Sequence, residues 1–194
     1  PYPTPFRAYA PHRLGTGGAR PSLLDAQAQA AIGAVVQDAA NSLGVRNGIV
    51  KGDMVYSDDK AYVIEVAARL SGGCFCTHEI PLNTGVSTVQ AAIKIAMGDS
   101  IDAQDLKPKF LRPVVQRYLF VPPGTVTSVS GVERAAAVDG VEFVDCWVKP
   151  GDTIIRPIHS GCTAAVAIAT GDSHAHALIR VEQALNLIRV ETAS

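Results

Sequence analysis

Two acidic residues stand out because each interrupts an apolar, β-rich run. Asp53 lies in the run 49–57 and Glu65 in the run 61–66, and the polar sequence Asp-Asp-Lys separates the two runs. Two such runs around a short polar stretch predict an antiparallel hairpin. Paired carboxylates, together with water and phosphate oxygens, are a common way for proteins to hold Mg²⁺. The hairpin is therefore the part of the chain where chemistry is expected.

The length of the hairpin tip decides whether the two acids meet. We expect a tip of residues 58–60, which pairs Asp53 directly with Glu65. Like charges directly opposite each other destabilise a sheet, so this register favours a cation between the carboxylates. A tip of only two residues would instead pair Asp53 with Ile64 and turn the acids to opposite faces.

Arg69 is expected on the same face as Glu65, because side chains alternate along a strand. An arginine beside a cation site suits the binding of a polyphosphate. The competing interpretation is an exposed hairpin with two solvated acids, since short apolar runs with scattered acids are common.

The hairpin sequence contains the pattern G-x-x-x-x-D, ending at Asp53, followed by V-I-E-V-x-x-R-x-S-G-G over residues 63–73. This order resembles the metal-binding end of the ATP-grasp superfamily, which includes biotin carboxylase, carbamoyl phosphate synthetase, phosphoribosylglycinamide synthetase and the amino-acid ligases. The resemblance implies ATP and Mg²⁺, or Mn²⁺, as cofactors. It implies that Asp53 and Glu65 bind the metal of Mg-ATP. Arg69 would be the catalytic residue, in contact with phosphate or with an acyl-phosphate intermediate.

One position departs from the pattern of the superfamily. Many members have asparagine two places after the second acid, as a further metal ligand, and this chain has Ala67 there. Alanine cannot coordinate a metal, so the resemblance stops short of a complete second metal site.

The elements around the hairpin predict an α+β fold. Apolar residues recur at helical spacing over 22–43, where Ser22 and Asp25 resemble a capping box and Gly44 is placed to end the helix. A helix that leads directly into a hairpin predicts a helix packed on one face of a sheet. A second helix is expected over 87–97.

Two domains are expected, with a boundary in a polar, proline-containing linker. Residues 1–112 are interpreted as part of the C-terminal lobe of an ATP-grasp domain, an antiparallel sheet with covering helices, which begins with irregular chain over 1–22. Residues 113–194 are interpreted as the small β-rich domain that follows this lobe in similar enzymes. In this domain we expect strands at 114–121, 125–132, 141–148, 153–158 and 164–170, and a closing helix at 173–187.

The segment after the hairpin contains three candidate substrate contacts, Thr77, His78 and Glu79. In similar ligases this segment follows the phosphate-side arginine and helps to form the acceptor pocket. For His78, a hydrogen-bonded structural role is the alternative. His174 and His176 could suggest a metal site, but side chains two apart on a helix point to different sides, so structural roles are predicted for both.

Composition and charge argue against several classes of function. The formal net charge is −1 without a long basic or acidic run, so neither a nucleic-acid nor a membrane-surface partner is expected. No apolar stretch is long enough to span a bilayer, and no signal peptide is visible. The four cysteines lack the spacing of a zinc site, so free, mostly buried thiols in a reducing cytoplasm are predicted.

The resemblance therefore implies a fragment of an ATP-dependent carboxylate–amine ligase that works through Mg-ATP and an acyl phosphate. Its partners would be a small carboxylate, an amine and the N-terminal ATP-grasp lobe of the same protein; a homodimer is left open. A phosphoribosylglycinamide synthetase or a biotin carboxylase-type enzyme is an alternative of the same class. A non-catalytic binding module that retains the fold is an alternative from another class. The residues do not distinguish the acyl donor or the acceptor.

Overall fold

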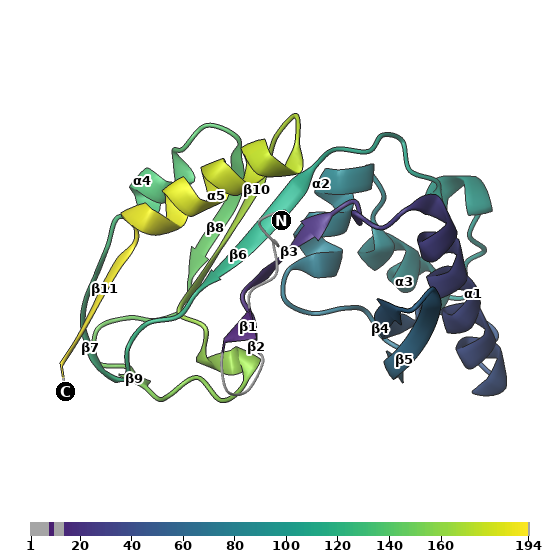
Figure 1. Cartoon of the computed structure of the whole chain (residues 1–194), viewed down its shortest axis with the longest axis horizontal. Helices are drawn as coiled ribbons and strands as arrows, with labels where there is room; N and C mark the ends of the chain where they lie inside the picture. Colours follow the sequence, from purple (N-terminus) through teal and green to yellow (C-terminus); the bar gives the residue numbers. More distant parts are fainter. Residues whose placement is uncertain (1–7, 10–13, 194) are drawn as a thin grey trace. The chain divides into compact units, whose positions relative to one another are not determined.

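The computed structural model describes residues 8–9 and 14–193 of the chain, which form two compact units (Figure 1). One unit comprises residues 22–111. The other comprises residues 112–193 together with the described residues before residue 22. This division falls beside the predicted boundary after residue 112. The assignment of the two parts to an ATP-grasp lobe and a β-rich domain stays a prediction.

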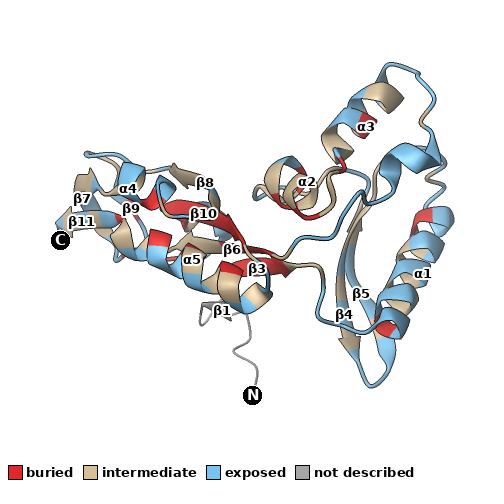
Figure 2. Cartoon of the chain, turned by 90° about the horizontal axis from the view of Figure 1, so that it is seen from above, coloured by how far each residue is buried: buried red, intermediate tan, exposed pale blue. Residues whose placement is uncertain are grey.

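The unit of residues 22–111 is built around a β-hairpin that lies alongside a long helix (Figure 2). The hairpin is antiparallel, and the helix α1 packs against both of its strands. The elements of this unit are α1 (Ala26–Ser42), β4 (Lys51–Ser57), β5 (Lys60–Ala67), the π-helix η1 (Phe75–Glu79), α2 (Ile80–Thr84), α3 (Thr88–Ala96) and the 3₁₀ helix η2 (Ala103–Leu106).

Helix α1 begins later than the sequence predicted. Asp25 is its N-cap, and the Asp25 carboxylate accepts a hydrogen bond of 2.8 Å from the backbone N–H of Ala28. The hydroxyl of Ser22 accepts instead from the N–H of Leu24, so the predicted capping box is wrong. The predicted end is confirmed, because Gly44 follows the helix in the left-handed region, with φ +74°.

The second unit contains two antiparallel sheets of three or more strands in the described residues (Figure 1). One has the strand order β3-β6-β10-β8 and the other β11-β7-β9. The elements of this unit are β1 (Ala8–Tyr9), β2 (Leu14–Gly15), β3 (Gly17–Arg20), β6 (Val114–Leu119), β7 (Gly124–Ser130), α4 (Val132–Ala136), β8 (Val141–Cys146), β9 (Thr153–Ile154), the 3₁₀ helix η3 (Ser160–Cys162), β10 (Ala165–Thr170), α5 (His174–Leu187) and β11 (Arg189–Ala193). The expectation of irregular chain before residue 22 is therefore wrong for the described residues, since β3 pairs with β6.

The core of this unit lies between the larger sheet and helix α5. All six residues of β10 are buried, as a central strand covered on both sides requires (Figure 2). Helix α5 contributes Ala177, Val181 and Ala184 to the same cluster, so small residues spaced by three and four let the helix pack closely on the strand.

The two histidines of the closing helix make separate contacts, as predicted. His174 Nε2 lies 2.9 Å from the backbone oxygen of Arg20, and His176 Nδ1 lies 3.5 Å from the carboxylate of Asp172. Each histidine therefore has its own partner within the protein. The predicted start of this helix is also confirmed, because the hydroxyl of Ser173 caps the N–H of His176.

The described residues contain no helix that combines the length and the apolar character needed to cross a membrane. The four cysteines, all in the described part of the chain, form no disulfide. Only Cys76 is buried, and the other three are half-buried, so the expectation of mostly buried thiols is wrong.

Candidate functional site

The hairpin pairs Asp53 directly with Glu65, as predicted, but its turn and the register of its strands differ from the prediction. The tip has only two residues, Asp58 and Asp59, because Ser57 pairs with Lys60. Both tip residues have positive φ, +50° and +57°, as a type I′ turn requires, and aspartate tolerates this region better than most residues. The predicted three-residue tip is therefore wrong.

A β-bulge at Ile64 restores the register that the short tip would have broken. Met54 pairs with Val63, but the next residue of β4, Asp53, pairs with Glu65, so Ile64 is the extra residue of β5. Ile64 is 68% exposed. Without the bulge a two-residue tip would place the two acids on opposite faces of the hairpin.

Alternation along the strands separates an outer face that carries the charges from an inner face that meets α1. Gly52, on the inner face, has so little space that a Cβ atom there would lie 2.9 Å from Cγ2 of Val36 in α1. We call the opposite side the acidic face; it is defined by Lys51 and Asp53 of β4, by Glu65 of β5 and by Arg69, which follows β5.

Lys51 bridges the two acids. Its ammonium group contacts Oδ2 of Asp53 and lies 3.4 Å from Oε1 of Glu65. The pKa of Lys51 is raised, first by its hydrogen bond with Asp53 and further by the charges of both acids, while partial desolvation opposes the rise. This lysine was missed by sequence reasoning, although its place two residues before Asp53 puts it on the same face of the strand.

Arg69 lies at the edge of the same group. Its Nη2 is 3.8 Å from Oε1 of Glu65, and its Nη1 donates a hydrogen bond of 3.0 Å to the carbonyl of Leu70. The side chain is 54% exposed, so its contact with Glu65 contributes little to stability. The structure thus brings Asp53, Glu65 and Arg69 together, and their predicted roles stay a prediction.

The two acids are of the kind that can bind a divalent cation. Lys51 and Arg69 contact only Oδ2 of Asp53 and Oε1 of Glu65, so each acid has a second oxygen outside these ion pairs. Mg²⁺ is commonly bound through one or two carboxylates together with water and phosphate oxygens. Among the described residues, no group of three or more His, Cys, Asp or Glu side chains could hold a metal.

The predicted substrate contacts all lie on the π-helix η1. The hydroxyl of Thr77 is 2.9 Å from Nδ1 of His78, and both side chains reach the surface. Glu79 is only 2% exposed. One-turn π-helices often occur at functional sites, but substrate binding by these three residues stays a prediction.

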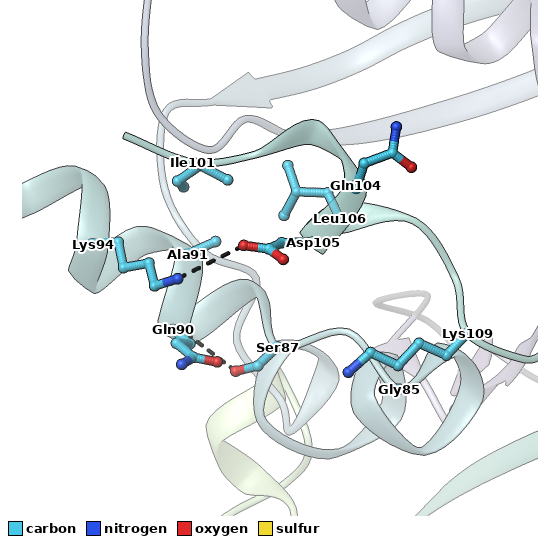
Figure 3. Close-up of a pocket in the computed structure, with 10 residues that line it drawn as sticks. All are labelled: Gly85, Ser87, Gln90, Ala91, Lys94, Ile101, Gln104, Asp105, Leu106 and Lys109. Atoms are coloured by element: carbon cyan, nitrogen blue, oxygen red, sulfur yellow. Dashed lines mark hydrogen bonds and ion pairs between the residues drawn. The ribbon is translucent and has the colours of Figure 1, made fainter. Parts of the chain in front are cut away.

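A pocket of about 270 Å³ lies between α3 and η2 in the same unit (Figure 3). Lys94 and Asp105 point toward one another across it, with 3.8 Å between Nζ and Oδ2 (Figure 3). At its wall, the hydroxyl of Ser87 caps α3 by accepting from the N–H of Gln90 at 3.1 Å. These polar groups have structural partners, and sequence reasoning gave no signal that the linker after residue 98 would close a pocket.

Comparison with known proteins shows which proteins this chain is similar to. A family model described as L-amino acid ligase C-terminal domain 2 matches residues 117–193. An uncharacterised protein of Sinorhizobium fredii, y4rH, is 31% identical over 135 residues, which are 69% of this chain and 27% of that protein.

Solved structures share the fold over nearly the whole chain. Phosphoribosylglycinamide synthetase from Anaerococcus prevotii matches with a TM-score of 0.83 and 17% identity, covering 97% of this chain and 48% of that one. L-amino acid ligase from Bacillus licheniformis matches with a TM-score of 0.78 and 20% identity, covering 93% and 44%. The biotin carboxylase domain of Hydrogenobacter thermophilus 2-oxoglutarate carboxylase matches with a TM-score of 0.69 and 19% identity, covering 93% and 40%.

The predicted resemblance to the C-terminal half of ATP-grasp ligases is therefore confirmed. The predicted fold class is confirmed as well, since mixed α and β elements with antiparallel sheets match these structural neighbours. The chain spans about a quarter of the length of the curated relative and less than half of these solved chains.

Proposed function

We propose that this chain is part of an ATP-dependent carboxylate–amine ligase that works with Mg-ATP through an acyl phosphate. The observation that carries the proposal is the direct pairing of Asp53 with Glu65 on an exposed face, with Arg69 3.8 Å from Glu65. Similarity to ATP-grasp ligases supports the class. One such neighbour, the Hydrogenobacter domain, was solved with Mg-ADP and bicarbonate.

The carboxylates of Asp53 and Glu65 would hold a magnesium ion that neutralises charge on the polyphosphate. Arg69 is exposed and close to Glu65, so its guanidinium can donate charge-assisted hydrogen bonds to a phosphoryl group bound beside the acids. Because Nη1 is anchored on the carbonyl of Leu70, Nη2 is the nitrogen directed toward the acidic face.

The proposed reaction has two steps. In the first, a substrate carboxylate oxygen attacks the γ-phosphorus of ATP, the bond to the β-phosphate oxygen breaks, and ADP leaves. In the second, the amine nitrogen attacks the acyl carbon, inorganic phosphate leaves, and the amine loses one proton. Arg69 would stabilise the charge on the phosphoryl oxygens in both steps.

The remaining parts of the proposal concern the whole protein. ATP-grasp enzymes enclose the nucleotide between two lobes, so we propose that an N-terminal lobe of the same protein completes the site. We place this ligase in the cytoplasm, where ATP is available and where four cysteines without a disulfide fit the reducing environment.

The experiment is an assay of phosphate release by the full-length protein with ATP and a panel of amino acids. Glu65→Gln is expected to lower turnover by at least about 10- to 100-fold, the loss that follows even from removing an outer partner of a bound metal. Glu133→Gln, at an exposed residue of α4, is the matched control and should keep normal turnover. Near-normal turnover of a folded Glu65→Gln protein would remove Glu65 from the site.

A further inference from the structure

Lys51 lies deeper in the acidic face than the acids that it contacts. Its side chain is 17% exposed, whereas those of Asp53 and Glu65 are 55% and 56% exposed. Its ammonium group touches one oxygen of Asp53 and lies 3.4 Å from one oxygen of Glu65. A positive charge between two directly opposed carboxylates removes the repulsion that would otherwise disfavour this register.

The residue across the hairpin from Lys51 is Ala67. Its methyl group leaves room for the lysine side chain and offers no atom that could bind a metal. Asp53 and Glu65 are also not joined by a third ligand side chain, because no cluster of three His, Cys, Asp or Glu occurs in the described ranges. Mg²⁺ takes one or two carboxylates together with waters and phosphate oxygens, so the two acids that share this face with Lys51 suffice for one ion.

We propose that Lys51 is a built-in cation of the acidic face, so that Asp53 and Glu65 bind one divalent ion with the polyphosphate and not two. Lys51 and the sheet take the inner side of the acid pair. Asp53 and Glu65 would hold the ion through their carboxylates, while Lys51 stays in contact with Oδ2 of Asp53 and near Oε1 of Glu65. Lys51 is thus a positioning residue, which holds the two carboxylates together whether or not the ion is bound. This inference rests on the function proposed above.

The test counts metal ions rather than turnover. Mn²⁺ is titrated into the full-length protein with a saturating, non-hydrolysable ATP analogue, and free Mn²⁺ is measured by electron paramagnetic resonance. The wild-type protein is expected to bind one Mn²⁺ per chain. Asp53→Asn should weaken this binding by at least about tenfold, because a neutral amide replaces a charged ligand of the ion.

Two variants isolate the part played by Lys51. Ala67→Asn adds a possible metal ligand but keeps the lysine, so it should still bind one Mn²⁺. The double variant Lys51→Met with Ala67→Asn removes the ammonium group as well and should bind two. Lys60→Met, at the far end of the hairpin, controls for the general loss of one positive charge and should bind one. Circular dichroism verifies that each variant is folded.

The outcomes separate the two proposals. Two Mn²⁺ ions per wild-type chain, or two in Ala67→Asn alone, would overturn the role of Lys51 and leave the ligase proposal standing. A folded double variant that binds only one ion would do the same. Nucleotide-dependent Mn²⁺ binding that is unchanged by Asp53→Asn would overturn the proposed metal site, and the role of Lys51 with it.

Discussion

Replacing Gly52 by alanine should loosen helix α1 from the hairpin. Gly52 lies next to Asp53 on the inner face of β4, and an added Cβ would stand 2.9 Å from Cγ2 of Val36. Overpacking of this kind costs about 1–3 kcal/mol. Alanine also reduces the freedom of the unfolded chain, which returns about 0.4–1 kcal/mol. We therefore expect a net destabilisation of about 1 kcal/mol. The overpacking cost should lie at the low end of its range, because Val36 is only half-buried and can shift.

The suitable assay is amide hydrogen exchange of the folded protein, read out in the peptide fragment that covers residues 49–67. The chain has one tryptophan, Trp147, which lies in the other unit, so fluorescence would follow the wrong part of the protein. A loss of 1 kcal/mol should speed the exchange of hairpin amides by about fivefold. Gly72→Ala is the matched control, because an added Cβ there meets no atom within 4 Å.

A double-mutant cycle attributes the effect to one contact. Val36→Ala removes the methyl group that the new Cβ would meet, so in that background Gly52→Ala should cost less than it does alone. Two results would contradict this explanation: stability losses of the two substitutions that simply add, or hairpin amides of the Gly52→Ala protein that exchange at the wild-type rate. Either would mean that the close approach of α1 to β4 does not explain the glycine at this position.

Three further predictions concern the rest of the chain. Ser173→Ala removes the cap of α5 and should cost about 1 kcal/mol in urea unfolding followed by the fluorescence of Trp147; an unchanged midpoint would contradict the capping role. Gly131→Ala should cost at least about 1–2 kcal/mol in the same assay, since φ is +83° and the added Cβ would meet the Leu187 carbonyl at 2.0 Å; wild-type stability would show that this turn can shift. The 194-residue chain alone should bind Mg-ATP no more tightly than micromolar by calorimetry, and submicromolar binding would show that it needs no second lobe.

The hairpin shows what could and could not be predicted from the sequence. Its position follows from the two apolar runs and is confirmed. The pairing of Asp53 with Glu65 is also present, but it was predicted from a three-residue tip that the structure does not have. The bulge at Ile64 could not be predicted, because an apolar residue in a run of apolar residues gives no local signal. With the bulge, Gly52 faces α1 while Asp53 pairs with Glu65 on the other side, an arrangement that involves a helix distant in the sequence.

The helix ends also differ in how far the local sequence predicts them. Ser173 caps its helix, as predicted, and Ser87, where the second helix was expected to begin, proves to be the N-cap of α3. Ser22 and Asp25 compete for one helix start, and the sequence alone favoured the wrong one. Strand β11 (Arg189–Ala193) was missed because its pairing with β7 joins residues about 60 positions apart, and such pairing leaves no mark in the local sequence.

The acidic face differs from an ordinary solvated hairpin in the residues that surround its charges. Val55 and Tyr62 pair directly across the strands and are 45% and 46% exposed, and Ile64 beside them is 68% exposed. A face that serves only to meet water would alternate polar residues at these positions. Charged groups beside exposed apolar groups are instead typical of a surface that meets a ligand or another part of a protein. The apolar residues next to Asp53 and Glu65 thus favour a binding site over the solvated alternative, independently of the similarity to ATP-grasp ligases.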